Sequence, residues 1–302
     1  MIADLRCPVC GEAFAHVPGG STGPTHAAGN VGPFRCARGH HFDLARQGYL
    51  SLLSGRSGPR TADTAEMVAA RLRVHAAGVL DRVVDAVAEV GASLAAGTDL
   101  IVDLGGGPGA YLRPVLRRCP DARGLVVDLS RFCARAVTRG DPPAAAVVAD
   151  IWRAIPVRTA AAGIVLSVFA PRNAAEIARI LGDDGHLLVV APLPDHLGEL
   201  IEPLGMLSVA PDKRERIEAA LGSAFTVVDR IEVRDRAHLA APTIADLVAM
   251  GPSAFHHDRA DLDAAAHRVA GAGRVEVTVA VTVTTYQKTT TTSRTTGQRS
   301  DS

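Results

Sequence analysis

Glycines follow a short apolar run that contains a carboxylate at residues 101 to 109, whose sequence is Ile-Val-Asp-Leu-Gly-Gly-Gly-Pro-Gly. Gly105, Gly107 and Gly109 let the backbone turn through positive φ, and their missing Cβ atoms let a ligand lie directly against the chain. A helix-like segment, 110 to 118, comes next. The pattern predicts a strand that turns sharply into a helix beneath a nucleotide-type cofactor.

Three carboxylates distinguish between the cofactors that such a loop could bind. The loop alone also fits the dinucleotide fingerprint, because Ala110 can replace its last glycine. Asp103 lies two residues before the first glycine, a position that is acidic in folds that bind the cationic amino group of S-adenosylmethionine (SAM). Asp128 ends the next apolar run and could accept both ribose hydroxyls, while Asp150 ends a third and could reach the adenine amine. One strand-end Asp is usually solvated, but three in succession favour SAM.

A second group of residues has the types and spacing of metal ligands. Cys7 and Cys10 form a Cys-x-x-Cys pair, and Cys36 and His40 follow as two further ligands four positions apart. Two turns of this kind converge on one tetrahedral ion, so we expect a closed, structural zinc site. A redox pair is the weaker alternative, because it leaves Cys36 and His40 unexplained. His41 is a possible substitute for His40.

Composition sets broad limits on the molecule. The chain of 302 residues is 47% hydrophobic with a formal net charge of zero, so it can bury an α/β core and has no overall attraction to nucleic acid. No apolar run could span a bilayer and no segment resembles a signal peptide, so we expect a soluble cytoplasmic protein with no membrane partner. Five cysteines, an odd number, argue against a disulfide framework.

Strand-like and helix-like segments alternate along the chain. Asp63 and Glu66 read as a capping box that opens a long helix, broken near Gly78. Beyond Asp150 the sequence predicts strands at 163–169, 186–191, 225–234 and 274–286, and helices at 173–181, 197–204 and 243–250. Seven strands that end in an antiparallel pair are typical of the class I SAM-dependent methyltransferase fold, a Rossmann-like α/β sheet.

We expect four parts along the chain. They are a zinc-binding module at 1–53, a linker at 54–63, a methyltransferase domain at 64–288 and a Thr/Ser-rich tail at 289–302, which we expect to be disordered.

Several segments together resemble one family. They are Leu-Arg-Cys-Pro-Val-Cys at 5–10, Cys-x-x-x-His at 36–40, Phe-Asp-Leu-Ala-Arg-Gln-Gly-Tyr at 42–49, the helix start at 63–71 and Val-Phe-Ala-Pro-Arg-Asn at 168–173. Over about residues 5 to 286 the chain resembles the RlmA/TlrB group of 23S ribosomal RNA guanine-N(1)-methyltransferases, most of all its macrolide-resistance, TlrB-like branch.

The resemblance implies a function and a set of site residues. It implies SAM-dependent methylation of N(1) of a guanine in a domain II hairpin loop of 23S rRNA, an N-terminal module that helps recognise the hairpin, resistance to macrolides of the tylosin or mycinamicin type, and a homodimer. One structural zinc ion would be held by Cys7, Cys10, Cys36 and His40, and SAM would contact Leu80, Ala110, Tyr111 and His196. The insert between Cys10 and Cys36 is longer than is usual in the family.

The segment Val168, Phe169, Ala170, Pro171 follows the fourth strand of the predicted domain, where a target base would enter. It lacks the Asn/Asp-Pro-Pro-aromatic sequence that holds an exocyclic amine, which disfavours adenine as the target. Phe169 either stacks on a flipped base or belongs to the core. Cys119 and Cys133 lie outside this segment, so a covalent pyrimidine mechanism is not expected, and the sequence identifies no general base.

Two other classes of function remain open. The chain could be a small-molecule SAM-dependent methyltransferase whose zinc module acts as a lid or dimerisation element. It could also be a catalytically silent RNA- or ribosome-binding protein, which the intact glycine loop and the three strand-end carboxylates oppose.

Overall fold

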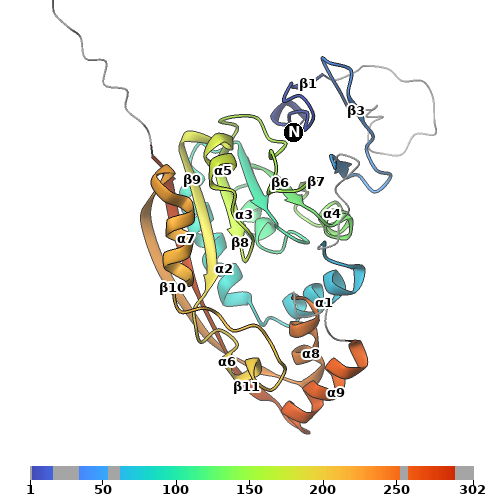
Figure 1. Cartoon of the computed structure of the whole chain (residues 1–302), viewed down its shortest axis with the longest axis vertical. Helices are drawn as coiled ribbons and strands as arrows, with labels where there is room; N and C mark the ends of the chain where they lie inside the picture. The colour runs from blue at the N-terminus through green and yellow to red at the C-terminus, as the bar shows by residue number, and fades with distance from the viewer. Residues whose placement is uncertain (1, 16–33, 54–61, 252–257, 290–302) are drawn as a thin grey trace, which may run out of the picture.

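One eight-stranded sheet organises the protein. The computed structural model describes residues 2–15, 34–53, 62–251 and 258–289 (Figure 1). In sheet order the strands are β10 (Phe225–Leu239), β11 (Val275–Lys288), β9 (Leu181–Pro192), β8 (Ala162–Val168), β5 (Leu100–Leu104), β6 (Arg123–Asp128), β7 (Ala145–Val148) and β4 (Leu50–Ser51). Only β11 runs antiparallel to its neighbours, β9 and β10. Seven of these strands, with one reversed near the edge, confirm the predicted class I methyltransferase fold.

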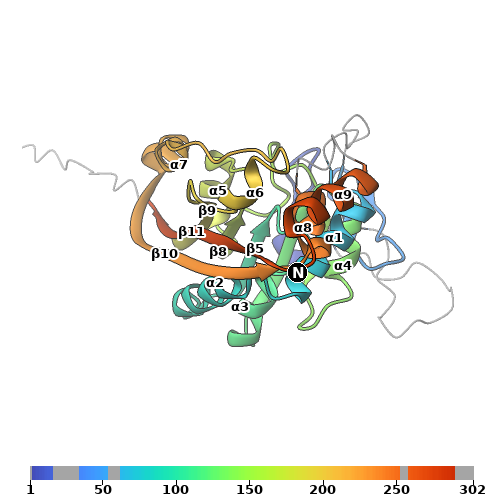
Figure 2. The same ribbon diagram turned by 90° about the horizontal axis from the view of Figure 1, so that it is seen from below.

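Helices cover both faces of the sheet. The helices α2 (Asp81–Leu94), α3 (Leu112–Arg118) and α4 (Arg131–Val137) lie on one face, and α5 (Ala174–Ile180) and α7 (Lys213–Leu221) on the other (Figure 2). In β5 every residue is buried, and Ile101 packs on the first face while Leu100 and Val102 pack on the second. A central parallel strand that is covered on both sides must be apolar throughout, as this one is apart from Asp103.

A group of helices packs beside the carboxyl ends of the parallel strands. It contains α1 (Ala65–Ala76), α8 (Ala241–Ala249) and α9 (Arg259–Ala270), and the last two are inserted between β10 and β11 (Figure 1). The carboxylate of Asp246 joins all three, because it accepts hydrogen bonds from Arg73 of α1 (both 2.7 Å) and from Arg259 of α9 (2.6 Å). The short α6 (Gly198–Ile201) follows β9.

The N-terminal segment forms a small sheet of its own. Its elements are η1 (Ile2–Asp4), β1 (Phe14–Ala15), β2 (Phe34–Cys36) and β3 (His41–Phe42). Leu5, Phe14 and Phe34 share one hydrophobic core with residues of the main sheet and α5. The next strand, β4, pairs in parallel with β7 and so extends the main sheet by one strand. The N-terminal segment is therefore packed firmly against the methyltransferase fold.

The start of α1 differs by one residue from the prediction, and the break after it is where the sequence predicts it. Thr64, and not Asp63, caps α1, because the Thr64 hydroxyl accepts the N–H of Met67 at 3.2 Å. The predicted capping box is therefore wrong by one residue. The predicted break is confirmed, since Gly78 has a φ of 74° between α1 and α2.

Other elements lie close to their predicted positions, with a few differences. β9 begins at Leu181 and β10 continues to Leu239, so both strands are longer than predicted. The helices α7 and α9 and the single turn η2 (Gly222–Ala224) were not predicted. Most of the Cys10–Cys36 insert, of the linker and of the tail lies outside the described residues. None of the helices in the described ranges combines the length and the apolar character needed to cross a membrane.

Candidate cofactor cavity and metal centre

A cavity of about 670 Å³ opens at the carboxyl ends of the parallel strands, between the sheet and the helices α1 and α8. Its volume is in the range of ligand sites. Most residues predicted from the sequence lie in its lining, namely Leu80, Gly105, Gly107, Ala110, Tyr111, Asp128, Asp150, Val168, Phe169, Ala170, Pro171 and His196. Asp103 and Gly109 are the predicted residues that do not line it.

The glycine loop has the conformation that the sequence predicts. Gly105, Gly107 and Gly109 have φ values of 65°, 55° and 80°, where residues with a Cβ are strained. A Cβ on Gly105 would lie 2.8 Å from the Cβ of Ala170. The backbone of the loop after β5 is therefore in close contact with the Ala170 side chain of the loop after β8. The N–H of Gly107 donates to Asp128 at 2.9 Å, which ties the loop to the end of β6.

Asp103 lies behind the glycine loop and not on the cavity wall. It is fully buried, and neither carboxyl oxygen has a hydrogen-bond partner among the described residues. A Cβ on Gly106 would lie 2.4 Å from the carboxyl carbon, so this glycine makes room for the acid. Burial, and then the charge of Asp128, raise the pKa of Asp103 to about 8. A cation bound at the loop would favour its ionised form.

Asp128 and Asp150 stand at the ends of neighbouring strands. Asp128 accepts N–H groups from Gly107 (2.9 Å) and Ser130 (2.8 Å), one on each oxygen. Burial nevertheless raises its pKa. Each carboxylate oxygen still has a lone pair free for a ligand hydroxyl. Asp150 accepts the N–H of Trp152 at 3.0 Å. This donor and acceptor set, with the unpartnered Asp103, fits a nucleoside cofactor that carries a positive charge.

Four rings line one side of the cavity. The ring of Tyr111 makes edge contacts with His75 (centroids 5.3 Å apart) and Phe169 (6.2 Å), and Phe169 stacks on His196 at 5.9 Å. Phe169 is 42% exposed and has a φ of 53°. That exposure excludes the alternative that Phe169 is a core residue, and leaves an aromatic face open to a ligand.

Both histidines of this row are uncharged at neutral pH. Burial lowers the pKa of His196 to about 4, although Asp195 and the Ala280 N–H act in the opposite direction. Burial and the charge of Arg71 lower the pKa of His75 to about 4. Because Nδ1 of His196 accepts the N–H of Ala280 at 3.1 Å, its neutral ring carries the proton on Nε2. His196 is thus a hydrogen-bond donor and not a proton acceptor.

Arg71 and Trp152 are two of the lining residues that the sequence did not predict. Arg71 of α1 pairs with Asp63, donates to the carbonyl of Met250 at 2.8 Å, and lies 3.1 Å from where a Cβ of Gly107 would be. Trp152, the single tryptophan of the chain, lines the cavity and is 64% exposed. An arginine on an amphipathic helix normally points into solvent, so no sequence signal marked Arg71, whereas an aromatic residue directly after the Asp150 strand end could have marked Trp152.

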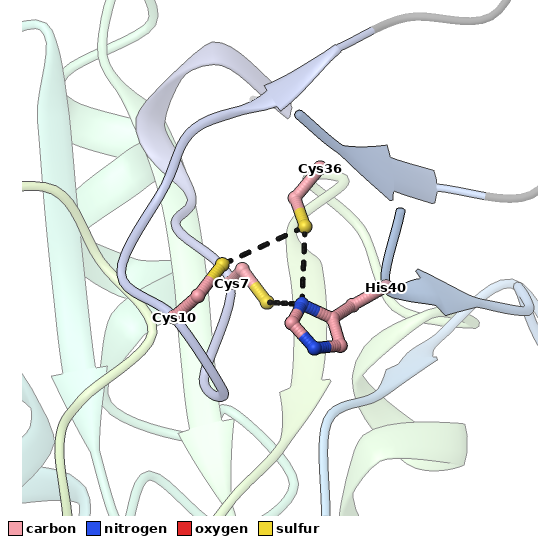
Figure 3. A group of neighbouring side chains, drawn as sticks. All are labelled: Cys7, Cys10, Cys36 and His40. Atoms are coloured by element: carbon pink, nitrogen blue, oxygen red, sulfur yellow. Dashed lines mark hydrogen bonds between the residues drawn. The ribbon is translucent and has the colours of Figure 1, made fainter. Parts of the chain in front are cut away.

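The four predicted metal ligands converge (Figure 3). The ligand atoms of Cys7, Cys10, Cys36 and His40 all lie within 4.8 Å of one another. Cys10 Sγ is 3.6 Å from Cys36 Sγ, and His40 Nδ1 is 3.4 Å from Cys36 Sγ and 3.7 Å from Cys7 Sγ. Tetrahedral zinc with ordinary bond lengths requires about 3.8 Å between two sulfurs and about 3.6 Å between sulfur and nitrogen. The cluster is therefore the right size for a metal ion.

His40, not its neighbour, completes this cluster. His41 is exposed and pairs in β3 with Arg35 of β2. Burial raises the pKa of Cys36, but the contacts with His40 and Cys10 outweigh it and bring the pKa to about 6. A thiol that ionises readily is suited to metal ligation. The other two cysteines, Cys119 and Cys133, lie at the end of α3 and in α4, away from the loop after β8, as expected.

Comparison with known proteins identifies the family. No family model matches the sequence. A relative from Micromonospora griseorubida, named "Putative 23S rRNA (guanine-N(1)-)-methyltransferase", is 40% identical over 95% of this chain and 98% of its own length. The 23S rRNA (guanine(748)-N(1))-methyltransferase of Streptomyces fradiae is 41% identical over 93% of this chain and 95% of its own.

Among solved structures, a SAM-dependent methyltransferase from Thiobacillus denitrificans in complex with S-adenosyl-L-homocysteine is 15% identical. It covers 67% of this chain and 90% of its own, with a TM-score of 0.41. The two sequence relatives decide the assignment, since each matches almost from end to end. This chain belongs to the family of 23S rRNA (guanine-N(1))-methyltransferases.

Proposed function

We propose that this methyltransferase transfers a methyl group from SAM to N(1) of a guanine in a domain II hairpin loop of 23S rRNA. The observation that carries the proposal is the meeting of two loops in one cavity, the glycine loop after β5 and the loop 168–171 after β8. The names of the relatives supply the substrate, since both are named for methylation of a guanine of 23S rRNA.

The cofactor half of the cavity has groups for each part of SAM, which when bound supplies a methyl group on a positively charged sulfur. The glycine loop leaves its backbone uncovered for close approach. Asp128 offers two oxygens to the ribose. Asp150 follows β7, the neighbouring strand, and lines the cavity where it could accept a hydrogen bond from the adenine amine. The unpartnered carboxyl of Asp103 favours a positive charge beside the loop.

The other half suits a flat, uncharged ligand such as a flipped base. Phe169 offers an exposed aromatic face beside the glycine loop, and stacking on such a face holds a base that has left its helix. The proton on Nε2 makes His196 a donor toward acceptors in the cavity, where guanine O6 is the acceptor next to N(1). The cavity thus orients the base and excludes water around the reacting atoms.

The remaining parts of the proposal concern the rest of the molecule. Cys7, Cys10, Cys36 and His40 hold one structural zinc ion, and the module at 1–53 helps the domain at 64–288 recognise the hairpin. A ribosomal RNA substrate implies a cytoplasmic enzyme. The family resemblance adds a homodimer, which light scattering of the purified full chain tests, and resistance to macrolides of the tylosin type.

Primer extension on 23S rRNA tests the central claim. A methyl group on guanine N(1) blocks base pairing, so reverse transcriptase stops at the modified nucleotide. We expect a new stop in domain II when the gene is expressed in a host without the modification, with guanine 748, for which the Streptomyces fradiae relative is named, as the first position to inspect. A matched Asp128→Ala variant should leave no stop. Tight SAM binding by the purified protein without any new stop would instead favour a small-molecule substrate.

A further inference from the structure

A second, smaller cavity lies on the α7 side of the sheet, next to the loop that carries Phe169. It has a volume of about 180 Å³ and lies between the end of β9, the first turn of α7 and β11. Lys213 and Arg214 form part of its rim, and the hydroxyl-bearing side chains of Thr282, Thr284 and Tyr286 form part of its wall. No acidic side chain contributes to this lining in the described part of the chain.

Further cations surround the rim. Arg172 immediately follows Pro171, which lines the cofactor cavity, and it acts electrostatically on Tyr286 in the wall of the smaller cavity. Burial, followed by the charges of Arg172 and Arg216, lowers the pKa of Lys213. Lys213 is therefore close enough to both Arg172 and Arg216 to be repelled by them. Lys213 and Arg216 are three residues apart on α7 and so lie on one side of that helix, where Lys213 also lines the smaller cavity. Arg172 follows Pro171 of the cofactor-cavity wall, so this group of cations begins one residue away from that cavity.

In the part of the chain that the structure describes, the three cations lack side-chain partners. Neighbouring carboxylates are engaged elsewhere: Glu215 pairs with Arg214, and Glu218 pairs with Arg230. Asp212 is exposed and makes no ion pair with Arg172, Lys213 or Arg216. Among the described residues no side-chain hydrogen bond or ion pair to any of these three cations exists.

Structural needs do not explain this arrangement. Lys213 is the first residue of α7, where a positive charge opposes the helix dipole. Three like charges without a counter-charge also destabilise each other, and partial burial of Arg172 and Lys213 adds a desolvation cost. An anion from outside the chain would remove all of these penalties at once.

We propose that the surface formed by Arg172, Lys213 and Arg216 binds the phosphate backbone of the RNA next to the flipped guanine. This inference rests on the proposed function, because it takes RNA as the substrate. The neutral overall charge of the chain gives no general attraction to RNA, so local cations must hold the backbone. Arg172 directly follows the loop 168–171. An RNA backbone bound at Arg172 would therefore guide the adjacent base into the cofactor cavity.

The salt dependence of RNA binding tests the proposal. A hairpin transcribed from domain II of 23S rRNA is titrated with the full chain and with the double variant Lys213→Gln/Arg216→Gln, and the dissociation constant is followed against salt concentration. We expect the double variant to bind about tenfold more weakly at low salt, with a salt slope smaller by about 1.5. Its SAM affinity, measured by the fluorescence of Trp152, and its melting temperature should not fall.

Arg82→Gln is the matched single-charge control, because Arg82 is an exposed residue of α2 on the opposite face of the sheet. It is compared with Lys213→Gln, which removes the same charge. Equal salt slopes for the Arg82, Lys213 and double variants would overturn the proposal. Displacement of the hairpin by inorganic phosphate at constant ionic strength would show a free-phosphate site instead and would also overturn it.

Binding is measured apart from methylation, so two failures can be told apart. A wild-type chain that binds the hairpin with the expected slope, but leaves no stop in primer extension, would refute the proposed methylation and leave this surface standing. If the wild type methylates the hairpin, and the Lys213 and Arg216 substitutions leave hairpin binding unchanged, the phosphate-binding surface alone is refuted. Absence of any binding by the wild-type chain refutes both.

Discussion

The ring of Phe169 stacks on the ring of His196, with centroids 5.9 Å apart and planes inclined by 26°. To reach this position the backbone of Phe169 takes a φ of 53°, a region that costs a residue with a side chain about 1 kcal/mol. Phe169 is 42% exposed, so burial of its side chain offsets only part of this cost. Strain that persists at an exposed aromatic residue is typical of a functional site.

Replacing Phe169 by glycine separates strain from function. Glycine accepts the left-handed backbone, so we expect the Phe169→Gly variant to melt within a few degrees of the wild type. Loss of the stacking face should lower kcat/KM for the RNA hairpin by about 10- to 100-fold, as expected for one base stacked on an aromatic ring. Phe169→Tyr, which keeps the ring, should retain activity. Full activity of the glycine variant would show that no base stacks here.

Asp103 makes stability depend on pH in a defined direction. Its pKa in the folded protein is about 8, above the ordinary value of 3.8. Between about pH 4 and pH 8 the unfolded chain therefore loses this proton while the folded chain keeps it, so the free energy of unfolding falls as pH rises. The stabilising contribution is complete below the unfolded pKa and is lost as pH passes through 8.

Urea unfolding without SAM at pH 5 and pH 8 checks this prediction. In Asp103→Asn the contribution is absent, so its unfolding free energy should decrease less between the two pH values than that of the wild type. Groups that are not coupled to Asp103 cancel in the comparison. An equal decrease in both proteins would mean that Asp103 is ionised in the folded state across this range.

The sequence predicted those parts of the molecule whose signals are local. The strand alternation, the positive-φ glycines and the spacing of Cys7, Cys10, Cys36 and His40 each follow from a few neighbouring residues, and the structure contains them. The cap of α1 was misplaced because Asp63 and Thr64 are both good capping residues. Asp63 instead pairs with Arg71, a tertiary contact that the sequence does not encode locally.

Features that depend on distant contacts were missed. The two residues of β4 have no periodicity, and they become a strand only because β7 provides a partner. The helix α9 buries only Leu262 and Ala266, and it is fixed through Arg259 and Asp246 to α1 and α8. Arg71 is also held in the cavity by a distant contact, because it donates to the carbonyl of Met250 at the end of α8.

Zinc content tests the metal centre with an internal control. Cys36→Ser removes a ligand and should cost about one zinc per chain, while His41→Ala changes the adjacent, exposed histidine and should cost none. Because Cys7 and Cys36 belong to the core that continues into the main sheet, loss of the metal should also lower the melting temperature. Metal analysis by mass spectrometry decides the point. Equal zinc in both variants contradicts the ligand set.

Glu176 should contribute strongly to stability at the place where Arg6 of the N-terminal segment meets the methyltransferase fold. Its carboxylate accepts the N–H of Ile155 at 2.6 Å, two bonds from Arg179 (2.7 and 2.8 Å) and one from Arg6 at 3.4 Å. We expect Glu176→Gln to lower the free energy of unfolding by about 2 kcal/mol, as for a hydrogen bond to a charged group. Glu215→Gln, which breaks an exposed pair, should change it little in the same urea titration. Similar effects of both changes would show that the bonds to Glu176 add no more stability than an exposed ion pair.

Arg71 is placed to bind a carboxylate of the cofactor. It is the one lysine or arginine among the described residues that line the cofactor cavity, where it stands among the carboxylates of Asp63, Asp128 and Asp150. A cofactor with a carboxylate of its own needs a cation there. Burial acts to lower the pKa of the Arg71 guanidinium, but the charges of Asp63 and its neighbours outweigh burial and keep the group charged. We therefore expect Arg71→Gln to weaken SAM binding by about tenfold.

Decarboxylated SAM shows whether the carboxylate is the cause. The wild type should bind this analogue more weakly than SAM, whereas Arg71→Gln should bind both alike, as titration of Trp152 fluorescence would record. Arg73→Gln is the control on the same helix, because Arg73 pairs with Asp246 outside the cavity and its loss loosens α8 without touching the ligand. If Arg71→Gln still distinguished SAM from the analogue as the wild type does, the guanidinium would act by bracing Asp63 and Met250 and not by binding the cofactor.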